Sequence, residues 1–128
     1  MEELVTGVNW LAVIVGFVVS FGLGWVWFSP KLFGKKWAEG NGLDPNGPDK
    51  MPMTAMVSQV VGTFLLAWVV GVTAKNDALL TILLITVTIV VLNGASSFFL
   101  NKNAYVRHTD AGFTVAMVVI MIICQGIF

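Results

Sequence analysis

Charge is scarce in this chain of 128 residues, because only 11% of the residues are charged whereas 57% are hydrophobic. Soluble domains of ordinary composition carry about a quarter charged residues. Water is therefore not the solvent for most of this surface, and the composition predicts a membrane protein whose first partner is the lipid bilayer. Seven basic and seven acidic residues balance, so no net charge attracts the chain to nucleic acid, which is not expected as a partner.

Residues that carry chemistry are equally scarce. The one cysteine, Cys124, has no second cysteine with which to form an intramolecular disulfide or a cysteine-based metal site. The one histidine, His108, cannot supply a two-histidine haem or metal site. The sequence contains no Cys-x-x-Cys motif, phosphate-binding loop or nucleophile–base pair. We therefore expect no enzymatic activity, no cofactor and no metal, and we assign no catalytic residues.

Long stretches without Asp, Glu, Lys or Arg separate the few charges. There are four of them, with lengths of 27, 24, 24 and 18 residues. A hydrocarbon core about 30 Å thick needs about 20 helical residues, and lipid cannot satisfy the open backbone of an isolated strand. The sequence thus predicts an all-α, polytopic membrane protein, a compact four-helix bundle in one domain. The expected spans are 8–28, 53–73, 78–100 and 111–128.

The connections between these spans differ in length. Residues 29–52 form the longest loop and contain all four prolines. Within it, Lys31–Trp37 places apolar rings beside lysines, which predicts one or two helical turns in the headgroup layer. Spans two and three are joined by Lys75–Asp77 alone, which predicts an antiparallel hairpin. The candidates for headgroup contact are Lys31, Lys35, Lys36 and Trp37.

The loop charges predict the orientation. The first and third loops together carry six basic residues, whereas the N-terminus, the second loop and the C-terminus carry only Lys75. Loops rich in Lys and Arg stay in the cytoplasm. We therefore expect a protein of the cytoplasmic (inner) membrane with both termini on the non-cytoplasmic side.

Three short runs in the first forty residues are distinctive: Asn9–Val13 (NWLAV), Gly24–Pro30 (GWVWFSP) and Leu32–Trp37 (LFGKKW). With these runs the chain resembles the small bacterial membrane protein family known as domain of unknown function number 1761. That family has a tyrosine where this chain has Phe28, and Asn-Ala-Gly-Tyr where this chain has Asp110–Phe113. The resemblance implies a four-span fold and no known activity.

Small residues recur at helical spacing on the first two spans. In lipid, such residues let helix backbones approach closely. The contact could lie within one chain or between copies in a homo-oligomer. We expect a leucine at Gly24 to disrupt the fold far more than a leucine at Gly71, which lies near a helix end. The candidate packing residues are Gly16, Ser20, Gly24, Ser58 and Gly62.

Polar side chains form a candidate layer at one depth in the bilayer. Ser20, Gln59 and Asn93 each lie roughly 10–12 Å from the cytoplasmic boundary at 1.5 Å per helical residue. Ser96 and Ser97 share the helical face of Asn93 through their i+3 and i+4 spacing. The layer could join helices through hydrogen bonds of about 0.6 kcal/mol each. Alternatively, it could line a small cavity open to the cytoplasm.

Asp110 is expected to cap the fourth span, because its carboxylate can accept from free N–H groups at a helix start. The neighbouring His108 is expected to be solvated. Carboxylates, lysines and arginines are missing from the expected spans, although ion-coupled transporters use such groups as relays.

Three classes of function remain open. The first is a structural or interaction component that forms a homo-oligomer or joins other membrane protein subunits. The second is an oligomeric pore for a small uncharged solute, lined by Ser20, Gln59, Asn93 and Ser97. The third is an accessory subunit that binds lipid or a cofactor, with the Trp25–Trp37 segment and its lysines meeting anionic headgroups.

Overall fold

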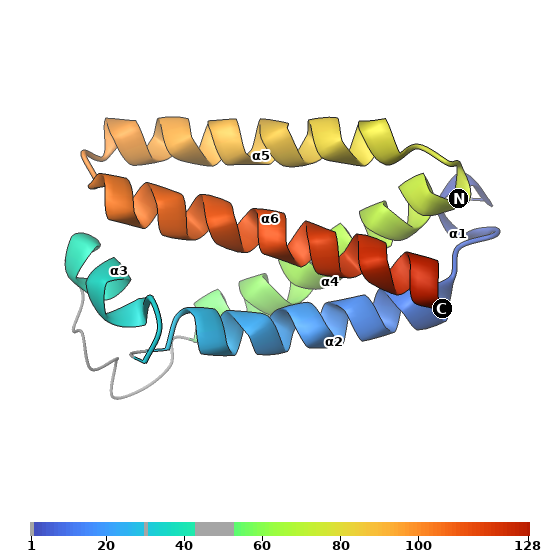
Figure 1. Ribbon diagram of the computed structural model, residues 1–128, viewed down its shortest axis with the longest axis horizontal. Coiled ribbons are helices and arrows are strands. Elements are labelled where there is room, and N and C mark those ends of the chain that lie inside the picture. The colour runs from blue at the N-terminus through green and yellow to red at the C-terminus, as the bar shows by residue number, and fades with distance from the viewer. Residues whose placement is uncertain (1, 30, 43–52) are drawn as a thin grey trace.

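The computed structural model describes residues 2–29, 31–42 and 53–128, all of whose regular elements are helices (Figure 1). Of the expected loop 29–52, residues 30 and 43–52 lie outside the described residues. Four helices are long and apolar enough to cross a membrane, which confirms the all-α, four-helix architecture. The elements are α1 (Glu2–Val5), α2 (Trp10–Trp27), α3 (Gly34–Gly40), α4 (Met53–Lys75), α5 (Leu79–Phe99) and α6 (Ala104–Ile127).

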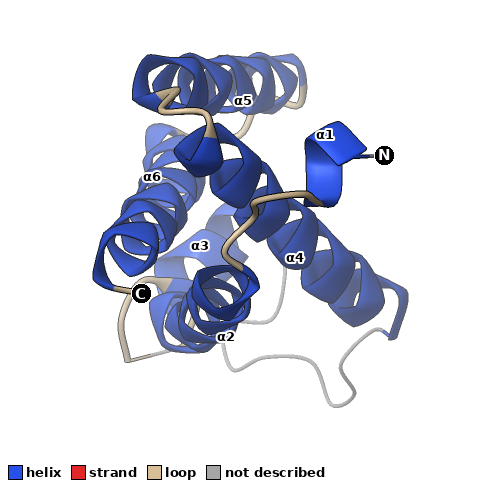
Figure 2. Cartoon of the chain, turned by 90° about the vertical axis from the view of Figure 1, so that its right-hand side faces the viewer, coloured by secondary structure: helices blue, strands red, loops and turns tan. Residues whose placement is uncertain are grey.

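Helix α6 is the central element of the bundle. Figure 1 shows it between α5 and α2, with α4 behind, and Figure 2 shows the same arrangement end-on. Apolar side chains also cover the outer faces of the bundle, because lipid solvates them as well as a protein core does. The residues that are buried within the protein are therefore concentrated on α6, which the other helices surround. The buried residues of α6 are Val106, Thr109, Phe113, Thr114, Met117, Val118, Met121 and Cys124.

Aromatic rings join α2 to α4 from the middle of these helices to the end of the bundle that carries α1. The ring centroids of Phe17 and Phe64 lie 5.7 Å apart, edge to face. Trp68 stacks near Trp10, and its indole Nε1 donates to the carbonyl of Leu4 over 2.7 Å. Such ring pairs add about 0.5–1.5 kcal/mol beyond the burial of their area. These contacts hold α2 against α4, while α4, α5 and α6 leave an open pocket of about 300 Å³ between them at this end.

Lys75 fixes α1 onto the end of α4. Its ammonium donates to the carbonyls of Glu3 and Thr6, the latter over 2.6 Å. A cation is favourable there, because the last carbonyls of a helix have no partners within it and carry negative partial charge. The one basic residue of the second loop therefore tethers the start of the chain.

The opposite half of α4 leaves the bundle. Its buried residues begin only at Thr63, and residues 53–62 are exposed apart from half-buried Met56. Figure 2 shows that the Met53 end of α4 leans away from α5 and α6. Helix α4 therefore packs on its neighbours from Thr63 onward and diverges from α5 and α6 toward Met53.

Candidate functional site

The small residues of α2 lie against α6. A Cβ placed on Gly16 would lie 3.3 Å from Cγ of Met121, and a Cβ placed on Gly24 would lie 2.9 Å from Cζ of Phe113. Ser20, between these two glycines, is fully buried, with an exposed fraction of 0%. This stripe therefore packs within one chain.

The small residues of α4 behave differently. A Cβ on Gly62 would meet nothing within 4 Å, and Ser58 is exposed. Gly71 corrects a second expectation, because it is buried and a Cβ there would lie only 2.7 Å from Cγ2 of Val13. Gly71 packs as closely as Gly24, since α2 and α4 come together at the end of the bundle that carries α1. The expected contrast between leucines at these two positions is therefore wrong.

The polar residues expected in one layer are not brought together. Ser20 and Ser97 are buried, with no hydrogen-bond partner for either hydroxyl in the structure. Gln59 is exposed and donates to Thr63 Oγ1 of its own helix over 3.2 Å. Asn93 and its neighbour Ser96 are also exposed. A shared depth therefore does not produce contact, because α4 diverges from the bundle at this level.

Gln59 and Asn93 nevertheless lie on the inward stripes of their helices. Gln59 precedes buried Thr63 by four residues, and Asn93 lies four residues before buried Ser97. Each amide therefore continues a buried stripe into a region that the other helices leave uncovered. The lean of α4 away from α5 and α6 leaves Gln59 exposed (Figure 2).

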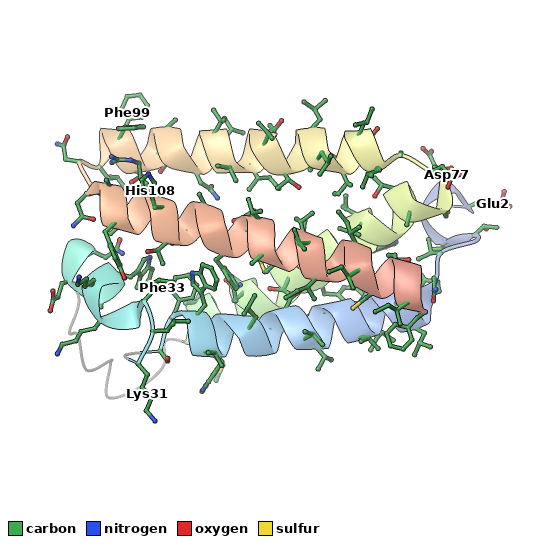
Figure 3. All side chains as sticks on the ribbon, viewed as in Figure 1. Glu2, Lys31, Phe33, Asp77, Phe99 and His108 are labelled. Carbon is green, nitrogen blue, oxygen red and sulfur yellow. The ribbon has the colours of Figure 1, made fainter. Side chains whose placement is uncertain are left out.

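The segment after α2 forms α3, and α3 docks on α6. Trp37 donates from Nε1 to Oδ1 of Asp110 over 2.8 Å, and its ring packs edge to face on Phe28 with centroids 4.9 Å apart. Phe33 points inward beside Trp27, whereas Lys31 projects away from the bundle (Figure 3). The candidates for headgroup contact therefore divide. Trp37 is bound to protein, while Lys31, Lys35 and Lys36 are exposed.

Helix α6 begins seven residues before the expected span, and Asp110 is not its cap. The cap is Asn103, whose side chain accepts from the backbone N–H of Val106 over 3.0 Å. Asp110 lies in the second turn of the helix, so the fourth long helix does contain charged residues. The exposed His108 precedes it by two positions. Sequence patterns missed the Trp37–Asp110 pair, because 73 positions separate its members.

Length, hydropathy and packing together define an integral membrane protein with four membrane-spanning helices. A sequence profile described as "Protein of unknown function (DUF1761)" matches residues 11–126, and the chain belongs to that family. The resemblance seen in the first forty residues is thereby confirmed. No curated protein and no solved structure matches the chain.

Proposed function

We propose that this protein is a non-catalytic structural component of the membrane that pairs with a second copy of itself through one face of α4. The members of this face have the i, i+3, i+4, i+7 spacing of one helix side, and all of them are exposed. We call it the open face of α4. It consists of Ala55, Ser58, Gln59 and Gly62.

The open face is poorly suited to lipid alone. The Gln59 side chain carries two N–H donors and a carbonyl acceptor, of which one donor bonds Thr63 within the helix. Acyl chains offer no hydrogen-bonding groups to the rest. Gly62 leaves a flat site beside it, where another helix backbone can approach closely.

A second copy suits this face better than an unrelated partner. Two copies inserted in the same orientation and related by a two-fold axis along the membrane normal place Gln59 at the same depth. A carboxamide carries both donor and acceptor, so two such groups can exchange hydrogen bonds. The face is therefore complementary to itself.

The first prediction tests this interface with two leucines. Gly62→Leu is expected to abolish pairing while leaving the fold intact, because a Cβ at this exposed position meets nothing within 4 Å, whereas a leucine blocks the approach of a second backbone. Gly22→Leu is the matched control, since a Cβ at Gly22 also meets nothing within 4 Å and lies on α2. Light scattering on both variants in one mild detergent gives the particle mass. Equal masses for the two variants would contradict the interface.

A conduit for a small uncharged solute is the second candidate. The observation that favours it is the position of Gln59 and Asn93 on inward stripes that remain uncovered. A ring of copies could bring these amides around a central axis. A particle that is larger than a dimer, and whose mass the Gly62→Leu substitution does not change, would favour the conduit over the pair.

We also propose that both termini lie outside the cytoplasm, because basic residues concentrate in the first and third loops. The second prediction uses single cysteines at Lys36 and Asn76, both exposed, in a Cys124→Ala background. An impermeant maleimide should label position 76 in intact cells and position 36 only after lysis. Asn76 is preferred to Lys75, which anchors α1. Labelling of position 36 in intact cells would reverse the orientation.

A further inference from the structure

A small cavity lies between α5 and α6. Its volume is about 10 Å³, close to the minimum of about 10–15 Å³ that one water molecule requires. A buried water also needs two to four polar partners. The polar residues that line this cavity are Asn93, Ser97, Arg107 and Asp110.

Ser97 is the residue that most needs a partner there. It is 7% exposed, and its Oγ is buried with no hydrogen bond in the structure. The hydroxyls of Thr86, Thr109 and Thr114 instead each donate to the carbonyl four residues earlier in their helices. Buried polar atoms in proteins nearly always find a partner, either protein or ordered water.

The α6 side of the cavity offers an acceptor. Oδ1 of Asp110 accepts a hydrogen bond from the Trp37 indole N–H, and Oδ2 remains as a further acceptor. The Arg107 guanidinium is engaged elsewhere, because it donates to the Lys102 carbonyl over 2.6 Å and stacks 4.0 Å from the ring centre of Phe98. The Arg107 and Asp110 side chains are therefore each held by a partner other than one another.

We propose that this cavity binds one water molecule, which bridges the Ser97 hydroxyl of α5 to the Asp110 carboxylate of α6, with the Asn93 amide as a third partner. The bridge gives α5 a polar attachment to the bundle. Among the described residues, the side-chain hydrogen bonds of α5 stay within that helix, at Thr86 and Thr88. Apolar contact alone holds helices weakly in lipid, because acyl chains replace it.

The test compares two buried serines with unpartnered hydroxyls. Ser97 lines the cavity, whereas Ser20 is packed in the α2–α6 contact. Nitrogen-15-labelled protein in deuterated detergent should show magnetisation transfer from a long-lived water to the amides of Ser97 and Ala111. Ser97→Ala should remove that transfer and lower the unfolding midpoint by about 3 °C. Ser20→Ala should leave the transfer in place and should not lower the midpoint.

Two results would overturn the water site. One is the absence, in the wild type, of magnetisation transfer from water to the amides of Ser97 and Ala111, which would mean that the cavity is dry. The other is a Ser97→Ala variant as stable as Ser20→Ala, which would mean that the Ser97 hydroxyl bonds within its own helix. Neither result depends on pairing through α4, so the water site and the proposed function fail separately.

Discussion

A Gly34→Ala variant is expected to lose the docking of α3 and to unfold far more easily than the wild type. A Cβ at this position would overlap the carbonyl oxygen of Phe28 and would lie 2.7 Å from that of Ser29. Both atoms are backbone, so no side-chain rotation relieves the contact. The Gly34 amide also donates to the Ser29 carbonyl over 2.9 Å, which holds the two segments together. We expect a loss of about 3 kcal/mol, the upper range for overpacking.

Gly22→Ala is the matched control for this substitution. Gly22 lies within α2, and a Cβ there would meet nothing within 4 Å. Alanine favours a helix interior over glycine by up to about 1 kcal/mol, so this variant should be neutral or slightly more stable. Unfolding midpoints of both variants and the wild type in one detergent provide the measurement. Equal midpoints would show that the turn between α2 and α3 yields to the added methyl group.

Trp37→Phe is expected to have the second largest effect. The substitution keeps an aromatic ring against Phe28 but removes the N–H that donates to Asp110 over 2.8 Å. Hydrogen bonds to charged groups contribute about 1.5–3 kcal/mol, and a half-buried carboxylate would lose its donor. We expect a loss of about 2 kcal/mol in the free energy of unfolding, measured by chemical denaturation in mixed micelles.

Trp25→Phe is the control, because it makes the same chemical change at a side chain that is 62% exposed. It should cost less than about 0.5 kcal/mol, as surface substitutions usually do. Asp110→Asn offers a second check, since its amide oxygen can still accept from Trp37 but carries no charge. If Trp37→Phe and Trp25→Phe were equally stable, the Trp37–Asp110 hydrogen bond would not hold α3.

The four long helices could be predicted from charge-free stretches, because the thickness of a bilayer sets the length of a span. The start of α6 could not be placed the same way. Its first turns carry Arg107 and Asp110, which read as loop until their partners are known. Those partners are the ring of Phe98 and the indole of Trp37, on other helices. A charged residue marks the end of a span only where no neighbouring helix supplies a partner for it.

The candidate site shows the same division. Helical spacing places Gly16 and Gly24 on one face of the first span, and Ser58 and Gly62 on one face of the second. Both stripes consist of small residues, so residue type does not tell which of them packs within the chain. The structure packs the first stripe on α6 and leaves the second open. Only the lean of α4 distinguishes them (Figure 2).

The sequence by itself determined that this is a membrane protein with four helices and a short hairpin between the second and third spans, because composition and span length follow from the solvent. Tertiary structure alone decided which faces meet, where α3 docks and which polar groups are buried. The physical reason lies in lipid, which solvates apolar side chains on every side of a helix. Hydrophobicity therefore does not tell an inward face from an outward one. Contacts between residues far apart in the sequence do tell them apart. In one of these contacts the Trp27 indole N–H donates to the Thr109 carbonyl, 82 positions away, over 3.1 Å.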